Sequence, residues 1–194
     1  MNAIAAKKKI LSATLTTWDR RLLAWHEAGH VVVSHFSPEQ ERVCCVSIDP
    51  SAKAFGMMKT RKTKRHNMTR RFLLGNISVA LAGRLAEEHF LHTLSSSCID
   101  DLNKAREIAI QMVASFGMGA RSGLLSCFNP VDNVLLILSN QQRENLFLDV
   151  RDLIDEAKEN ALKILKTHAS QVENIASLIF KRVTLGGDDL KGFL

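Results

Sequence analysis

The sequence has no long uninterrupted apolar segment, and this absence argues against a membrane span. The run Val134–Leu138 is short, and the stretch from Phe72 to Leu91 is interrupted by glycine, asparagine, arginine and glutamate. The lysines at positions 7 to 9 are not followed by the apolar segment and cleavage site of a secretory signal peptide. We therefore expect a soluble chain without a membrane span.

Cysteine is also scarce, and its pattern excludes a disulfide framework. The chain of 194 residues has four cysteines, of which Cys44 and Cys45 are adjacent, and it has no Cys-x-x-Cys pair. A reducing, cytoplasmic location is therefore expected. With 46% hydrophobic residues, the chain is not of the disordered class and can bury the core of one domain.

Acidic residues are missing from one segment, where most of the net charge of +6 is concentrated. Residues 59–71, KTRKTKRHNMTRR, contain seven Lys or Arg and no Asp or Glu. Such a run is typical of either a nucleic-acid surface or a solvated loop. Because no aromatic residue is interleaved to stack on bases, we favour a basic mobile loop and expect no nucleic-acid partner.

The periodicity of apolar residues predicts a mainly α (α+β) fold. We expect residues 1–16 to be an N-terminal extension and residues 17–194 to form a single domain. The expected helices cover residues 17–36, 69–92, 100–116, 141–167 and 170–182, and the expected strands cover 43–48 and 55–60. The fold would then have a small sheet beside the first helix, C-terminal helices within 141–185, and a frayed tail containing Gly186, Gly187 and Gly192.

The first of these helices carries His26, Glu27 and His30 in the pattern His-Glu-x-x-His. Residues four apart lie on the same helix face, so both imidazoles can bind one Zn²⁺. A carboxylate beside them can act as general base for a zinc-bound water, because zinc lowers the pKa of that water to about 7. The alternative is a core helix with two incidental histidines.

A catalytic zinc usually has three protein ligands, and the sequence offers two further pairs of acids. Glu87 and Glu88 lie near the end of the second long helix, and Asp100 and Asp101 lie at the start of the third. Acids at a helix N-terminus are often only dipole-complementing caps, and acids on a helix face are often only solvated charges. The residues alone leave the third ligand open.

Five separated blocks in register resemble the FtsH-type peptidase domain. They are Trp25–His30, Ala82–Glu88, Asp100–Ala105, Phe116–Met118 and Gly123-Leu124, and the resemblance extends from about Thr17 to Leu185. It implies a zincin-like helical peptidase domain with a small β-sheet beside the His-Glu-x-x-His helix and a C-terminal helical pair.

The resemblance also implies roles for individual residues. His26, His30 and Asp101 would be the zinc ligands, with Glu27 as base. Glu87 would lie beside the metal and orient a ligand imidazole. The segment Gly56, Met57 and Met58 matches the edge strand on which an extended substrate is bound by strand addition.

Residues 97–101, SCIDD, depart from the small residues and Asn-Asp of the family, so Asp100 remains an alternative to Asp101. Cys98, in the same segment, is either a small buried residue, which we favour, or a soft donor near the metal.

The resulting expectation is a zinc-dependent endopeptidase acting on unfolded or flexible polypeptides. No Gly-x-x-x-x-Gly-Lys-[Ser/Thr] phosphate loop occurs in the chain, so we expect no ATPase activity of its own. The resemblance implies a homo-oligomeric ring, of which a hexamer is one form, and a separate AAA+ ATPase as a candidate partner. The alternative is a non-catalytic binding or scaffold module with the same fold.

Overall fold

The computed structural model of the chain describes residues 15–49, 56–61, 67–127 and 138–194. Its elements follow one another as α2 (Thr17–Phe36), β1 (Val43–Ser47), β2 (Met57–Thr60), α3 (Arg70–Leu91), the 3-10 turn η1 (Ser96–Cys98), α4 (Ile99–Ala114), α5 (Asn140–Thr167), α6 (Ala169–Arg182), β3 (Thr184–Gly186) and α7 (Gly187–Leu190). The mainly helical fold with a small sheet is as predicted. The expected N-terminal extension lies outside the described residues except for its last two.

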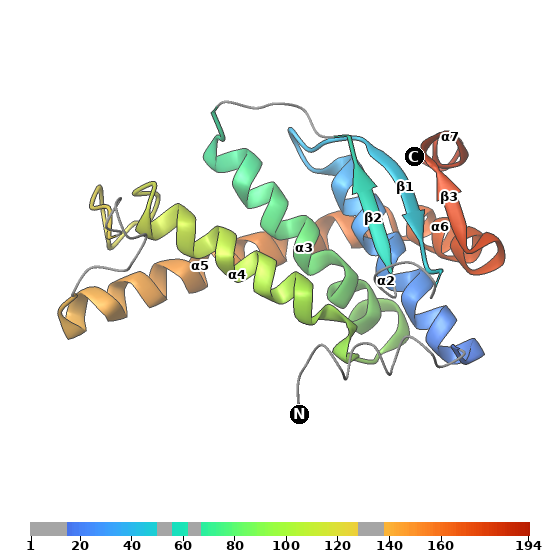
Figure 1. The fold of residues 1–194 in the computed structure, drawn as a ribbon, viewed down its shortest axis with the longest axis horizontal. Helices are drawn as coiled ribbons and strands as arrows, with labels where there is room; N and C mark the ends of the chain where they lie inside the picture. The colour runs from blue at the N-terminus through green and yellow to red at the C-terminus, as the bar shows by residue number, and fades with distance from the viewer. Residues whose placement is uncertain (1–14, 50–55, 62–66, 128–137) are drawn as a thin grey trace.

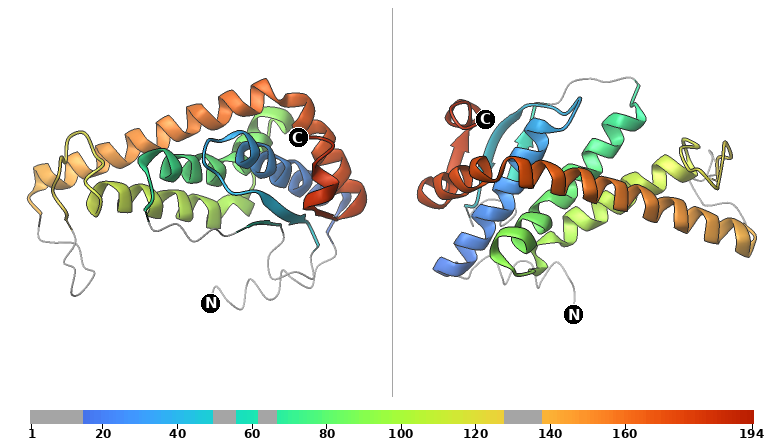
Figure 2. Two further views of the ribbon diagram at one scale, coloured as in Figure 1. Left: turned by 90° about the horizontal axis from the view of Figure 1, so that it is seen from above. Right: turned by 180° about the vertical axis from the view of Figure 1, so that it is seen from behind.

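The helices form two layers, and the sheet covers one side of the first layer (Figures 1 and 2). Helices α2, α3 and α4 lie side by side, and α5 and α6 run across their back. Fully buried side chains from both layers, such as Ile77, Met112, Leu165 and Ile175, form the core between them. The buried faces of α2 and α3 meet at the centre of this arrangement.

Local polar residues fix where the two central helices begin. Thr16 Oγ1 accepts a hydrogen bond of 3.1 Å from the Asp19 N–H, and Asp19 Oδ2 accepts one of 3.0 Å from the Thr16 N–H. This reciprocal capping box satisfies amide groups that the first turn of a helix leaves unpaired. Thr69 Oγ1 likewise accepts from the Phe72 N–H at 3.0 Å and starts α3. The first helix begins at the predicted residue 17, and Thr69, where the second was predicted to begin, is the N-cap of α3.

The sheet has one more strand than the sequence predicted. Its order is β2-β1-β3, and β1 is antiparallel to both neighbours. The expected frayed tail is therefore wrong, because Leu185 in β3 and Leu190 in α7 are buried in the core. Asp189 Oδ2 accepts a hydrogen bond of 2.9 Å from the Gly186 N–H, and Asp189 Oδ1 one of 2.9 Å from Arg182. A strand of three residues beside two glycines carries too little periodicity to be recognised.

The basic segment 59–71 lies only partly on described residues, because 62–66 are outside them. Lys59 belongs to β2, and Arg70 and Arg71 begin α3, so the expected loop is shorter at both ends. Arg70 donates two hydrogen bonds, of 3.1 and 2.6 Å, to the carboxylate of Glu156 on α5. Across the described parts of the chain, no helix combines the length and apolar character needed to cross a bilayer.

Candidate metal centre

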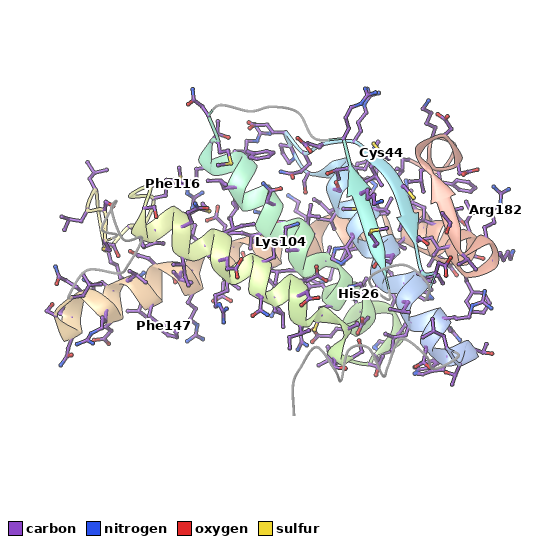
Figure 3. The ribbon with its side chains drawn as sticks, viewed as in Figure 1. His26, Cys44, Lys104, Phe116, Phe147 and Arg182 are labelled. Atoms are coloured by element: carbon purple, nitrogen blue, oxygen red, sulfur yellow. The ribbon has the colours of Figure 1, made fainter. Side chains whose placement is uncertain are left out.

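Helix α2 places the His-Glu-x-x-His residues in the interior, where His26, Glu27 and His30 are 3%, 4% and 6% exposed. The two imidazoles point the same way, and their Nε2 atoms are 3.0 Å apart. Asp101, in the first turn of α4, brings Oδ2 to 3.2 Å from each Nε2. Figure 3 shows His26 where α2 and α3 meet the start of α4, away from Phe116 and Phe147 at the other end.

Hydrogen bonds at the opposite ring atoms determine which nitrogen of each histidine faces this cluster. His30 Nδ1 lies 2.7 Å from the carbonyl oxygen of Val79. Since a carbonyl only accepts, His30 Nδ1 carries the proton and donates it. His26 Nδ1 donates in the same way to Glu87 Oε1 at 2.6 Å. Both Nε2 atoms are therefore available as ligands.

The charges around the cluster favour a cation at its centre. Burial lowers the pKa of His26, but hydrogen bonds to Asp101 and Glu87, together with the charges of Glu27 and Glu87, outweigh it and raise this pKa to about 10. Burial raises the pKa of Asp101, but hydrogen bonds to His26 and His30 and their charges hold it well below its usual range. Carboxylates thus stabilise positive charge at His26, and a divalent cation satisfies the same requirement.

The donor set fits a zinc ion. Within the described part of the chain, His26, His30 and Asp101 form a group whose ligand atoms all lie within 4.8 Å of one another. Two imidazole nitrogens and one carboxylate oxygen are ligands that zinc accepts, and three protein ligands leave a position for water. The Asp101 side chain is 29% exposed, so this side of the cluster is open to solvent.

Gly83 on α3 makes room for the cluster. A Cβ atom at this position would overlap His26 Nε2 and lie 2.5 Å from Cε1 and 2.6 Å from Cδ2 of the same ring. Only glycine lets the α3 backbone pass this close to a ligand ring. A glycine inside a long helix costs about 1 kcal/mol of stability relative to alanine. At position 83 the close approach of α3 to the His26 ring explains why a glycine is present.

Glu27 is a buried carboxylate with an unsatisfied oxygen. Its Oε2 has no hydrogen-bond partner within the described residues. Burial raises the pKa of Glu27; the charges of His30 and His26 oppose this, and the charge of Asp101 adds to it. A buried polar group without a partner is uncommon and often marks a reactive site.

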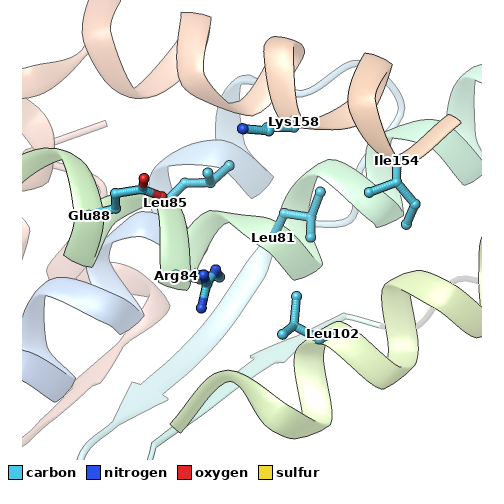
Figure 4. Close-up of a pocket in the computed structure, with 7 residues that line it drawn as sticks. All are labelled: Leu81, Arg84, Leu85, Glu88, Leu102, Ile154 and Lys158. Carbon is cyan, nitrogen blue, oxygen red and sulfur yellow. The ribbon is translucent and has the colours of Figure 1, made fainter. Parts of the chain in front are cut away.

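Glu87 and Glu88 point to different sides of α3. Glu87 is completely buried and accepts hydrogen bonds from His26, Ser95 and Ser97, so it orients a candidate ligand. These hydrogen bonds lower its pKa against the effect of burial. Glu88 instead faces a separate hollow between α3, α4 and α5 (Figure 4), whose other lining residues are Leu81, Arg84, Leu85, Leu102, Ile154 and Lys158. The metal cluster is not part of this hollow.

Two sequence alternatives lie outside the cluster. Asp100 precedes Asp101 in α4 and is exposed, whereas Asp101 contacts both histidines. Cys98 is buried, and its Sγ donates to the carbonyl oxygen of Ser95 at 3.4 Å.

The sequence did not reveal that Ser95 and Ser97 bond to Glu87, because they resemble an ordinary polar turn. Nothing in the sequence indicated that the carbonyl of Val79 would accept a hydrogen bond from His30.

Comparisons of the sequence with known proteins identify the family of the chain. The sequence model of peptidase family M41 matches residues 13–193. The ATP-dependent zinc metalloprotease FtsH of Thermobaculum terrenum is 31% identical over 197 residues, which cover 97% of this chain and 30% of the relative. FtsH of Thermotoga maritima is 31% identical over 200 residues, which cover 98% of this chain and 32% of the relative. FtsH 2 of Sphaerobacter thermophilus is 34% identical over 174 residues, which cover 89% of this chain and 26% of the relative.

The chain thus spans between about a quarter and a third of the length of these relatives. All three are named as zinc metalloproteases, so Zn²⁺ is the expected cofactor for His26, His30 and Asp101. The family match covers nearly every residue, including all the elements that build the cluster, and the chain therefore belongs to peptidase family M41.

Proposed function

We propose that this chain is a zinc metalloendopeptidase that hydrolyses peptide bonds in unfolded or flexible polypeptides. The observation that carries the proposal is the unsatisfied, buried Glu27 carboxylate beside the converging ligand atoms of His26, His30 and Asp101. These three residues would bind the zinc. When bound, zinc supplies Lewis-acid chemistry, which polarises a carbonyl and makes water more acidic.

Residues of the chain carry out proton transfer and orient the zinc ligands. Glu27 Oε2 accepts the proton of the attacking water and then delivers it to the nitrogen of the leaving amine. Burial, which raises the pKa of Glu27, suits a group that must bind and release a proton near neutral pH. Glu87 and the carbonyl of Val79 fix the two imidazoles so that Nε2 faces the reaction site.

Strand β2 is the proposed docking edge for the substrate backbone. It pairs with β1 on one side and has no other strand beside it within the described residues. Gly56, just before β2, lies against the base, because a Cβ there would overlap Glu27 Oε1 and lie 3.0 Å from its Cδ. A peptide added in extended form along Gly56, Met57 and Met58 would pass next to Glu27.

We do not propose that this chain uses ATP to unfold its substrates. The relatives are named ATP-dependent, but the matched region is between about a quarter and a third of each of them. The chain contains no phosphate-loop motif, so we propose peptide hydrolysis without ATP. A homo-oligomeric ring and a separate AAA+ ATPase stay predictions from the resemblance.

The test compares wild type with Glu27→Gln in casein degradation with added Zn²⁺ and without nucleotide, while zinc binding is measured on the same samples. We expect Glu27→Gln to bind zinc normally and to lose about 10²–10⁴-fold in rate. Glu88→Gln is the matched control, because Glu88 is an exposed glutamate on α3 and should leave the rate unchanged. A zinc-loaded wild type that cleaves nothing would favour the non-catalytic scaffold, and equal rates in Glu27→Gln would exclude Glu27 as base.

A further inference from the structure

Glu87 is surrounded by four hydrogen-bond donors although it is fully buried. Its Oε1 accepts from His26 Nδ1 at 2.6 Å, from Ser95 Oγ at 3.0 Å and from Ser97 Oγ at 3.0 Å. Its Oε2 accepts from the backbone N–H of Ser95 at 2.9 Å. The ionised carboxylate only accepts, and these donors contact both of its oxygens, three at Oε1 and one at Oε2. Three of the four donors come from the turn that contains η1.

The two serines also contact each other, which orders their hydroxyl groups. Their Oγ atoms are 2.5 Å apart, and the N–H of Ser97 donates to Ser95 Oγ at 3.3 Å. Ser95 Oγ can therefore accept from the Ser97 N–H, while each hydroxyl gives its single proton to Glu87 Oε1. With donors on the serine side, Glu87 acts as acceptor toward His26 as well, and the proton between them stays on Nδ1. Nε2 of His26 is then the ligand atom.

The same turn leads directly into the helix that carries Asp101, the proposed third ligand. Residues Ser96–Cys98 form η1, and α4 begins at the next residue with Asp101 in its first turn. Anchoring the turn to Glu87 on α3 therefore fixes where α4 starts. One buried carboxylate thus connects His26 from α2 with the segment that carries Asp101.

From this geometry we propose that Ser95 and Ser97 are positioning residues of the metal centre. Through Glu87 they keep His26 in its ligating tautomer and place Asp101 within reach of the same ion. The inference rests on the proposed zinc site of His26, His30 and Asp101. It assigns a role to two hydroxyl groups that are not among the proposed ligands and that bond to Glu87.

The experiment measures zinc affinity of the full chain by competition with a chromophoric chelator. Loss of groups that orient metal ligands typically weakens binding by about 10–100-fold, which we expect for the double variant Ser95→Ala/Ser97→Ala. Ser96→Ala is the matched control, because Ser96 lies in the same turn, is exposed and makes no side-chain hydrogen bond within the described residues. It should bind zinc like wild type. The double variant Ser95→Thr/Ser97→Thr, which keeps both hydroxyl groups, should restore most of the affinity.

Thermal unfolding with and without zinc separates positioning from a merely structural role. Zinc that binds only the folded state raises Tm according to its affinity, so weaker binding reduces this zinc-dependent rise. A purely structural effect would lower Tm equally in both conditions.

The outcomes distinguish failure of the positioning role from failure of the proposed function. If wild type binds zinc and the alanine double variant binds it equally tightly, the positioning role is wrong while the proposed function stands. If wild type binds no zinc, both fail. Should the double variant not fold, Ser97→Ala alone decides, because Ser97 is exposed and its replacement leaves the backbone bond from Ser95 in place. Unchanged zinc affinity in that single variant would overturn the proposal.

Discussion

Replacing Gly83 with alanine tests whether α3 shapes the metal centre. The new methyl group would overlap Nε2 of His26 and lie 2.5 Å from Cε1 of its ring. The ring cannot move away freely, because Nδ1 is bonded to Glu87 at 2.6 Å and the ring of His30 lies edge-on at a centroid distance of 4.7 Å. Either the imidazole turns and gives up its hydrogen bond, or α3 moves away from α2.

The expected change in the free energy of unfolding is smaller than the expected change in zinc affinity. Alanine in a helix interior gains about 1 kcal/mol over glycine, and overpacking costs about 1–3 kcal/mol, so Gly83→Ala should destabilise the fold by about 0–2 kcal/mol. Displacing a ligand ring should weaken zinc binding by about 100-fold or more, which corresponds to about 2.7 kcal/mol. The loss of affinity should therefore exceed the loss of stability.

Urea denaturation of the metal-free chain and chelator competition measure the two quantities. Gly75→Ala is the control, because it lies in the same helix and its methyl group would meet the flexible amide of Gln40 instead of a fixed ring. Zinc affinity should be unchanged in Gly75→Ala. If Gly83→Ala binds zinc as tightly as wild type, the close approach of α3 to His26 is not what shapes the site.

Two further predictions address the third ligand and a distant loop. Asp101→Asn should abolish the Tm difference between zinc-loaded and EDTA-treated protein, whereas Asp100→Asn should keep it; the reverse result in scanning calorimetry would make Asp100 the ligand. Asp149 is 2% exposed and accepts hydrogen bonds from the N–H groups of Arg121 at 3.0 Å and Ser122 at 2.7 Å, so Asp149→Asn should cost about 1.5–3 kcal/mol in urea denaturation. Burial raises the pKa of Asp149, but the hydrogen bonds from Arg121 and Ser122 lower it overall, so its contribution is complete above the unfolded pKa of about 3.9 and disappears as the pH falls through the lower folded pKa. A variant whose stability below pH 3 still differs from wild type by as much as at pH 7 would contradict this assignment.

Local features of this chain could be predicted because they depend on residues at most four positions apart. Thr16 and Asp19 are three apart and mark the start of α2, and His26 and His30 are four apart and share one face. The choice among the acids depends instead on how α3 and α4 pack. The residues alone therefore left four acids open, and only the family resemblance pointed to Asp101.

Other features escaped prediction because they depend on contacts between distant parts of the chain. Strand β3 exists because it pairs with β1, about 140 positions away, and not because its three residues favour a strand. The bonds from Ser95 and Ser97 to Glu87 depend on the turn folding back onto α3. Polar residues in a turn have many alternative partners, and the sequence does not tell which of them forms.

Helix α3 completes the proposed zinc site although it supplies none of the three proposed ligands. The carbonyl of Val79 orients His30, Gly83 leaves room for the His26 ring, and Glu87 orients that ring through Nδ1. These three positions are four residues apart in succession, so they form one stripe on the face of α3 that meets α2. Because the same stripe of α3 orients both imidazoles and leaves room for the His26 ring, a small rotation of α3 would disturb both histidines together. The proposed metal centre is in this sense a property of the α2–α3 pair, and substitutions on another side of α3, such as at Glu88, which lines the hollow between α3, α4 and α5, should leave zinc binding intact.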